Sequence, residues 1–381
     1  MEWKEYSLGD ISKLKYGKNV SAKLCKGPVP IFSGYRKIGT CNTINCKKNT
    51  VIVIARGAGG CGDVKLTKED CFLTNLSISV ELDKGICNAK WFYYNHLLNN
   101  LSFLNSGSAQ PQITIDSLSK YLIRIPPIII QRKIAGILSA LDSKIENNNK
   151  INANLESQAQ ALFKSWFVDF TPFKDQPFVD SELGPIPQGW KVGKLGDIGE
   201  IVGGSTPSKS KPEYYTTHGI AWLTPKDLST SKAKFTSRGE IDITDEGYKS
   251  TSTKLMPRGS VLFSSRAPIG YLTIAKNEIC TNQGFKSLVP NGAGTGFIYY
   301  TLRHLTPQIE NRATGSTFKE ASATLMRSVE TIVPPTSILN KFEELLRPIL
   351  QFQEKKEEEN QRLAALRDTL LPKLMSGEIK L

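Results

Sequence analysis

Hydrophobic side chains recur about every seven residues between Ile130 and Phe170, a spacing that predicts one long amphipathic helix. The apolar residues at this spacing are Ile134, Leu141, Leu155 and Leu162. The polar Asn148 fills the remaining step, and Gly136 is the only Gly or Pro between residues 130 and 165. Such a helix would be about 60 Å long, more than a small domain covers. We therefore expect a partner helix along it; the alternative is one long amphipathic helix on a single domain.

The same hydrophobic pattern returns 208 residues later, which supplies the partner helix. Its apolar steps are Phe342, Ile349, Leu363 and Leu370. Lys356 stands at the step that Asn148 fills in the first copy. Two polar steps would lower the stability of an antiparallel pair and help to fix its register. Pro348 lies inside the second pattern and predicts either a kink or the start of the regular helix.

The segments before the two helices also resemble each other. The opening WK…LGDI at Trp3 recurs at Trp190, and Pro126-Pro127 recurs as Pro334-Pro335 just before the second helix. An apolar run ends on an arginine in both copies, at Arg56 and at Arg266. We also match the pair Thr74-Asn75 with Thr281-Asn282. This ordered series predicts a tandem duplication of a globular unit followed by a long helix.

Short β-branched runs separated by Gly, Asn, Ser and Lys clusters indicate mixed α/β globular units, so the predicted fold class is α+β. Strands are expected at Val51–Ile54, Leu76–Val80, Val261–Phe263 and Leu272–Ala275, and helices at Trp91–Leu101 and Phe297–Leu305. The predicted boundaries are 1–128 for the first domain, 129–172 for the first long helix, 173–336 for an extended linker with the second domain, and 337–381 for the second long helix. If the helices pack as an antiparallel coiled coil, an approximate two-fold axis relates the domains.

Charge favours a nucleic acid as the partner. Lys and Arg number 49 against 36 Asp and Glu, a formal net charge of +13 over 381 residues. No apolar run is long enough to cross a membrane, and the first residues lack the pattern of a signal peptide, so we expect a cytoplasmic protein with reduced cysteines. Six of the seven cysteines fall in the first ninety residues, but no pair has CxxC spacing, so we predict no structural metal.

Arg56 and Arg266 are the leading candidates for reading DNA bases, because each follows a predicted strand and each recurs in the duplicate. The alternative for both is an arginine paired to a carboxylate of its own domain. Weaker candidates for DNA contacts are Arg36, Lys37, Gln110, Gln112, Lys209, Lys211, Lys226 and Lys319. Most lysines that touch DNA bind phosphate and carry no sequence information.

Catalytic motifs are missing from the sequence. The three histidines form no metal-binding pattern, and we find no nucleophile constellation, no phosphate-binding GxxxxGK[ST] loop and no adenine-methyltransferase tetrapeptide. The segment Gly57–Gly62 satisfies GxGxxG, but a dinucleotide site needs a helix after the third glycine, and the residues after Gly62 have no helical spacing. A nucleotide-dependent enzyme is therefore the weaker alternative, and a non-catalytic binding protein is favoured.

The sequence resembles the specificity subunits of Type I restriction–modification enzymes. The resemblance covers essentially the whole chain, and the repeated WK…LGDI openings, the two proline pairs, LFKSWFVDFTPF from Leu162, LLPKLMSGEIKL from Leu370, GSTFKEAS and VLFSSRAPIG carry it. The first domain departs from the pattern, since GSAQPQIT stands where the second domain has GSTFKEAS. That difference fits a different target sequence.

The resemblance implies two target-recognition domains, each reading one half of a bipartite double-stranded DNA target, with the helices setting the gap between the halves. It further implies no cofactor in this chain. Two modification (methyltransferase) subunits would bring S-adenosylmethionine, and restriction (endonuclease and translocase) subunits, where they join, would bring ATP and Mg²⁺. An elongated protein–protein scaffold that binds no DNA remains the alternative.

Overall fold

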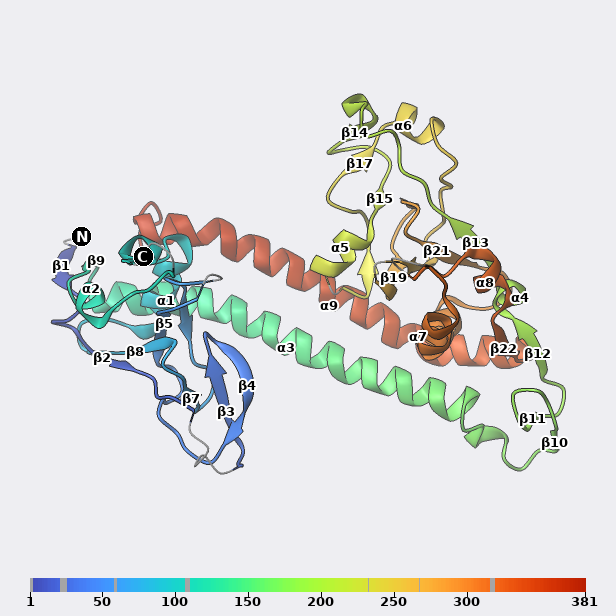
Figure 1. Cartoon of the computed structure of the whole chain (residues 1–381), viewed down its shortest axis with the longest axis horizontal. Helices are drawn as coiled ribbons and strands as arrows, with labels where there is room; N and C mark the ends of the chain where they lie inside the picture. Colours follow the sequence, from blue (N-terminus) through green and yellow to red (C-terminus); the bar gives the residue numbers. More distant parts are fainter. Residues whose placement is uncertain are drawn as a thin grey trace. The chain divides into compact units, whose positions relative to one another are not determined.

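The structure is a computed structural model that describes residues 3–20, 26–57, 60–106, 110–231, 233–266, 268–315 and 319–381. The chain divides into two compact units, Met1–Glu146 with Asn360–Leu381 and Asn147–Glu359. The boundary between the units falls within both long helices, α3 (Ile128–Phe167) and α9 (Thr336–Ser376), so each helix contributes one part to each unit (Figure 1). We call the globular part of each unit, without the long helices, its head.

The first head is built on two small sheets and a strand pair. The first sheet has the spatial order β2 (Ser12–Tyr16), β8 (Ser77–Leu82), β5 (Val51–Ile54) and β6 (Val64–Leu66). The second sheet has the order β4 (Arg36–Cys41), β3 (Val29–Ser33) and β7 (Phe72–Leu73). The strand pair is β1 (Lys4–Ser7) with β9 (Leu122–Ile125). Helices α1 (Ala89–Leu98) and α2 (Ile115–Ser119) and the 3-10 turn η1 (Ser102–Leu104) complete it. Strand β5 is fully buried, as expected from its run of β-branched residues.

The second head repeats this plan with additions. Its main sheet has the order β13 (Gly199–Gly203), β21 (Lys286–Pro290), β18 (Val261–Ser265), β19 (Ile269–Ala275) and β16 (Phe235–Thr236). The strand pairs are β12 (Lys191–Lys194) with β22 (Glu330–Val333), β15 (Trp222–Leu223) with β20 (Cys280–Thr281), and β14 (Tyr215–Thr216) with β17 (Asp242–Ile243). The helical elements are α4 (Leu195–Ile198), η3 (Pro212–Tyr214), α5 (Pro225–Thr230), α6 (Asp245–Lys249), α7 (Thr295–Arg312) and α8 (Ala323–Ser328).

The duplication is visible in the strand pairing of the two heads. The first and last strands of each head pair antiparallel, β1 with β9 and β12 with β22, so that each long helix begins directly after its proline pair. A parallel pair recurs as well, β3 with β7 and β15 with β20. The predicted α+β class and tandem repeat are therefore confirmed.

The hydrogen bonds correct one match of the predicted repeat. The amide of Thr74 donates to the Phe32 carbonyl in the first head, and in the second the amide of Asn282 donates to the Leu223 carbonyl at the equivalent place. Thr74 thus corresponds to Asn282 and not to Thr281. The chance recurrence of the pair Thr-Asn misplaced the match by one residue, and the shift of 208 holds here too.

Within the first unit, the two helical parts pack antiparallel beneath the head. Ile134 and Leu138 of α3 share a buried cluster with Leu371 and Leu374 of α9, and the predicted packing residue Leu370 packs against this cluster. Farther along the pair, the Arg367 guanidinium lies 2.8 Å from the Asp142 carboxylate. Leu141 and Leu363 are half-buried.

Within the second unit, the pairing is also antiparallel. Phe342 is fully buried among the aromatic rings of Phe163 and Phe167, and the predicted Leu162 and Ile349 pack against this cluster. Leu155 is half-buried.

The two predicted polar steps meet at one carboxylate of the second unit. The buried Asn148 amide donates to the Glu359 carboxylate over 3.0 Å, and the Lys356 ammonium lies 2.8 Å from the same oxygen. A shared polar contact of this kind favours one register over neighbouring ones.

The expected helix boundaries need correction at the prolines. Helix α9 begins at Thr336, so Pro348 does not mark its start, and α7 runs past Pro307 to Arg312, beyond the predicted end at Leu305. Both prolines are exposed, so water can bind the carbonyl that each leaves unpaired. The linker after α3 is not simply extended: it holds the 3-10 turn η2 (Thr171–Phe173) and a short hairpin of β10 (Phe178–Val179) and β11 (Ile186–Pro187).

Candidate nucleic-acid interface

Arg56 lies at a corner of the first head where the chain leaves the buried strand β5. It forms an isolated β-bridge with Gln112, and the neighbouring Ile113 amide donates to the Ala55 carbonyl over 2.9 Å. The Nε atom of Arg56 is buried and has no hydrogen-bond partner in the described residues. No carboxylate of the described part of the chain pairs with this guanidinium, so it can still donate to a ligand.

Arg266 occupies the equivalent corner after strand β18 in the second head. It forms a β-bridge with Glu320, as Arg56 does with Gln112, and the Ala321 amide donates to the Ser265 carbonyl over 2.9 Å. Here the Arg266 guanidinium pairs with the Glu320 carboxylate at 3.0 Å, and Lys286 reaches the other oxygen at 3.3 Å. The alternative of an arginine paired to a carboxylate of its own domain therefore describes Arg266.

The two corners have matching neighbours, as the sequence predicted. Gln112 and Glu320 stand at the same bridging position, and Lys319 precedes Glu320, with its ammonium 3.4 Å from the Glu310 carbonyl. Gln110 is exposed. Parts of both loops, residues 107–109 and 316–318, lie outside the described residues.

Arg36 and Lys37 open strand β4 at the tip of a hairpin. The two turn residues before them, Gly34 and Tyr35, have φ values of 52° and 63°, as a tight two-residue hairpin turn requires. The Tyr35 ring stacks on Phe32, with centroids 5.3 Å apart, and its hydroxyl donates to the Leu66 carbonyl. The hairpin therefore presents two exposed cations that form no ion pair among the described residues.

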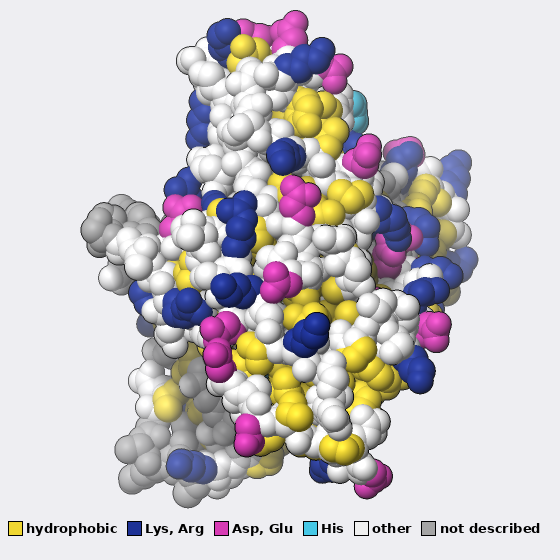
Figure 2. Space-filling model, turned by 90° about the vertical axis from the view of Figure 1, so that its right-hand side faces the viewer, with side chains coloured by type: hydrophobic (Ala, Val, Ile, Leu, Met, Phe, Trp, Pro, Cys, Tyr) yellow, Lys and Arg dark blue, Asp and Glu magenta, His cyan; other side chains and the backbone are white. Residues whose placement is uncertain are grey.

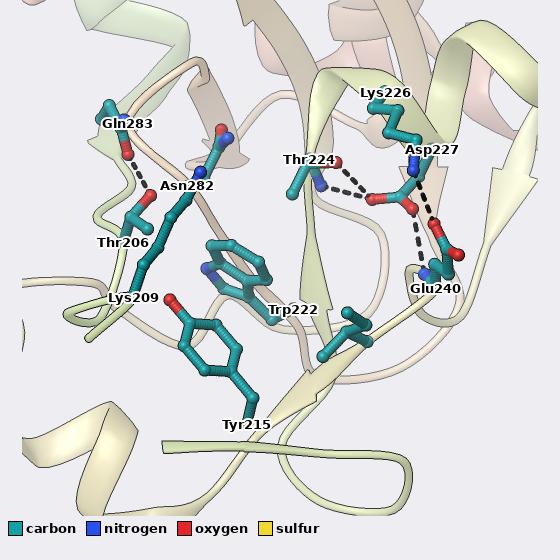
Figure 3. A pocket seen from close by; sticks show the side chains of 11 residues that line it. Thr206, Lys209, Tyr215, Trp222, Thr224, Lys226, Asp227, Glu240, Asn282 and Gln283 are labelled. Atoms are coloured by element: carbon teal, nitrogen blue, oxygen red, sulfur yellow. Dashed lines mark hydrogen bonds and ion pairs between the residues drawn. The ribbon is translucent and has the colours of Figure 1, made fainter. Parts of the chain in front are cut away.

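Lys209 and Lys226, two further candidates, line a pocket of about 490 Å³ in the second head (Figure 3). The Trp222 and Tyr215 rings lie against each other in it, with centroids 6.0 Å apart. Lys226 pairs with Glu240 at 3.0 Å, and this hydrogen bond raises the pKa of the ammonium. Lys209 forms no ion pair within the described chain, so it remains available to an anion.

The amides of Asn282 and Gln283 also line this pocket. Asn282 accepts the Gly284 amide at its side-chain oxygen, and Gln283 accepts the Thr206 hydroxyl at its own. Because both side-chain oxygens already accept a hydrogen bond, the two amide nitrogens are left to donate into the pocket. Sequence reasoning missed these two amides and the two aromatic rings; Asn282 appeared there only as part of the repeated Thr-Asn pair, with no binding role.

Lys211 lies outside this pocket. Its ammonium donates to the Tyr214 hydroxyl over 3.0 Å and stands 5.0 Å from that ring's centroid. The hydrogen bond to Tyr214 raises its pKa, so Lys211 stays charged.

Basic and acidic side chains are interspersed over the face in Figure 2, and no single continuous basic area covers it.

The described residues hold no group of three His, Cys, Asp or Glu side chains arranged for a metal ion. Cys41, Cys46, Cys61, Cys71, Cys87 and Cys280 are buried and unpaired. Part of the Gly57–Gly62 loop, residues 58–59, lies outside the described residues, and the loop leads into strand β6 and not into the helix that a dinucleotide site requires. None of the helices in the described ranges is long and apolar enough to cross a membrane.

Comparison with known proteins defines the class of protein. The sequence matches the Type I restriction modification DNA specificity domain twice, over residues 1–157 and 187–363. The chain therefore belongs to this family and carries its domain in two copies, in agreement with the resemblance of its motifs.

Individual relatives are specificity subunits. The chain is 26% identical to the Type I restriction enzyme HindI specificity subunit of Haemophilus influenzae, over 99% of this chain and 100% of that protein. It is 38% identical to the MjaIX specificity subunit of Methanocaldococcus jannaschii over 44% of this chain, which spans only 41% of that relative. The crystal structure of a Type I restriction–modification S subunit from M. genitalium has the same fold, with a TM-score of 0.69 at 19% identity over 98% of this chain and 96% of that one.

Proposed function

We propose that this chain is the non-catalytic, DNA-reading subunit of a Type I restriction–modification complex. Each head would read one half of a bipartite duplex target. The observation that carries the proposal is the repeated corner: a buried strand ends on Arg56 in one head and on Arg266 in the other, each bridged to the same position of a second loop. Two copies of one polar corner on two separate heads suit a target with two half-sites.

The second head offers the groups that base reading and phosphate binding require. Amide nitrogens of Asn282 and Gln283 can donate to acceptor atoms on base edges, and Lys209 can bind a backbone phosphate. In the first head, the Arg56 guanidinium supplies a donor for a base or a phosphate, and Arg36 and Lys37 supply exposed cations. This division of contacts gives orientation through phosphates and sequence preference through bases.

The long helices would set the distance between the two half-sites and carry the docking surfaces for two modification subunits. Those subunits would bring S-adenosylmethionine and extrude the target base, since methyl transfer requires the base to leave the stack. Where restriction subunits join the same assembly, they would bring ATP and Mg²⁺. This chain would then contribute recognition and geometry to the complex, and the chemistry would belong to its partners.

Exchange of one head tests the proposal. Residues 184–335 would be replaced by the corresponding segment of a relative with a different target, and the modified bases in host DNA would be mapped. We expect one half of the methylated sequence to change and the other half to stay. The reciprocal exchange of residues 1–128 is the matched control and should change the opposite half. An unaltered methylated sequence in both exchanges would favour the protein–protein scaffold.

A further inference from the structure

A basic pocket of about 650 Å³ lies in the first unit, lined by residues of the head and of α3 and sharing none with the Arg56 corner. Its lining includes five basic side chains and a single carboxylate, Glu81. The basic residues are Lys47, Lys48, Lys84, Lys90 and Arg132. Glu81 is already paired with Lys15 at 3.1 Å, and Lys47 is paired with Asp70 at 3.0 Å. Lys48, Lys84, Lys90 and Arg132 are exposed and form no ion pair among the described residues.

The walls that hold these cations are fixed by buried hydrogen bonds. The Gln131 side chain is fully buried; it accepts the Asn88 amide at 2.7 Å and donates to the Ile86 and Pro126 carbonyls at 2.8 Å. These bonds tie the turn before α1 to the first turn of α3, and so bring Arg132 beside Lys84 and Lys90. Like charges gathered on a rigid wall repel one another, a cost that an anionic ligand would remove.

In the second unit, a carboxylate of α9 lies at the corresponding place. At the start of α7, which matches α1, Glu343 accepts the Phe297 amide over 2.7 Å. Ala135 of α3 stands at the position of Glu343, and the match of WFYY from Trp91 with FIYY from Phe297 sets Lys90 against Gly296. A side chain at Gly296 would run into Leu346, so that place cannot hold a cation. At these two positions the second unit therefore has a carboxylate and a glycine where the first unit has Ala135 and a pocket cation.

We propose that this pocket binds backbone phosphates of DNA next to the half-site that the first head reads. The inference rests on the proposed function and adds a sequence-independent contact to it. A run of phosphates suits four cations spread over one pocket better than a single small anion does, and the lysine ammonium groups act as point charges without base preference. The pocket would raise affinity for every DNA sequence equally and would leave sequence preference unchanged.

The test compares two triple variants of the full chain. Lys84→Gln, Lys90→Gln and Arg132→Gln remove three pocket cations. Lys4→Gln, Arg124→Gln and Lys380→Gln remove the same charge from exposed sites of the same unit outside the pocket. Binding to a cognate duplex and to an unrelated duplex would be measured by fluorescence anisotropy at several salt concentrations, with thermal unfolding as a check on folding.

We expect the pocket variant to lose on the order of 10–100-fold affinity for both duplexes at physiological salt, and the salt slope to fall by about 2–3, because each lost phosphate contact removes about 0.9. The affinity and the salt slope of the control variant should change far less. Equal losses of affinity in the two variants would overturn the proposal that the pocket binds DNA phosphates. Unchanged DNA binding with loss of modification-subunit assembly would also overturn it, because the pocket would then be a docking site for a protein. If wild-type chain and complex both fail to bind DNA, the proposed function itself fails. Should the triple variant unfold, Lys90→Gln alone should lower the slope by about 0.9.

Discussion

The two heads share one backbone plan but neutralise their cations differently. At the corner that ends the buried strand, Arg266 and Lys286 of the second head are both paired to Glu320, whereas Arg56 of the first head faces the neutral Gln112. The residue at the bridging position, Glu320 or Gln112, therefore decides whether the arginine already forms an ion pair within its own head. Binding groups can be switched on or off in this fold without any change of the backbone.

The heads also differ in how they are fixed to the long helices. In the second unit, Lys234 is buried and its ammonium contacts Glu156, Tyr300 and Gln353 at 2.6, 2.6 and 2.9 Å. In the first unit, Asp142 accepts the Tyr94 hydroxyl and pairs with the partly exposed Arg367. The first head thus contacts the helices through a hydrogen bond to a carboxylate that also forms a partly exposed ion pair between the two helices, whereas the second head contacts them through a buried ion pair. Loss of the ion pair should therefore affect the second unit more.

The largest effect is expected from Lys234→Met. The substitution leaves the half-buried Glu156 carboxylate with only the exposed Arg303 as an ion-pair partner, and breaking a buried pair from one side costs about 3–5 kcal/mol of unfolding free energy. Urea unfolding measures the loss. The double variant Lys234→Met with Glu156→Gln removes both charges and should recover part of it. A Lys234→Met protein as stable as wild type would show that the buried contact does not hold the head.

The same pair predicts a dependence on pH. Burial by itself would raise the pKa of Glu156, but the Lys234 ammonium and hydrogen bonds from Lys234, Gln160 and Tyr300 lower it from 4.5 to about 2. A carboxyl whose pKa is depressed in the folded state stabilises the protein above pH 4.5 and loses that contribution as the pH falls towards 2. Urea midpoints of wild type and Lys234→Met should therefore converge over this interval. A constant difference between them would contradict the linkage.

Arg56→Ala should come next in size. If the unpaired guanidinium reads a base, its loss costs about 1–3 kcal/mol of specific DNA binding, and sequence preference relaxes in one half-site. Arg266→Ala is the matched variant and should cost less, because Arg266 is already paired with Glu320. Binding to a cognate duplex and to duplexes altered in either half separates the two. Equal losses at both corners would remove the distinction between the heads.

The periodicity of the long helices was predictable because heptad spacing survives whatever the heads become, and it located Ile134 and Phe342 in their buried clusters. The repeat likewise placed Arg56 and Arg266 at equivalent corners. The contact between Arg266 and Glu320 was not predictable, because 54 residues separate them and the sequence does not show which carboxylate folds beside which cation. The pocket of Trp222 and Asn282 was missed for the same reason: short strands from distant segments bring its lining together.

Exchange of the bridging residues tests the corner comparison directly, with an effect of about 1 kcal/mol on DNA binding. Glu320→Gln frees Arg266 and Lys286 and should strengthen binding and steepen its salt dependence. Gln112→Glu places a carboxylate opposite Arg56 and should weaken binding by a similar amount. Salt titration of the two single variants and their double variant measures both changes. If both single variants shift affinity in the same direction, the bridging residue does not control the arginine.

Arg367→Ala should have the smallest effect, because its pair with Asp142 is about a quarter to a third exposed and solvent screens it. Pairs of this kind contribute about 0–1 kcal/mol of unfolding free energy. The Tyr94 hydroxyl still donates to Asp142 at 2.6 Å, so the carboxylate keeps a partner when the arginine is lost. Urea unfolding should place this variant close to wild type and well above Lys234→Met. A loss as large as that of Lys234→Met would mean that the two units depend equally on their ion pairs, whatever the burial.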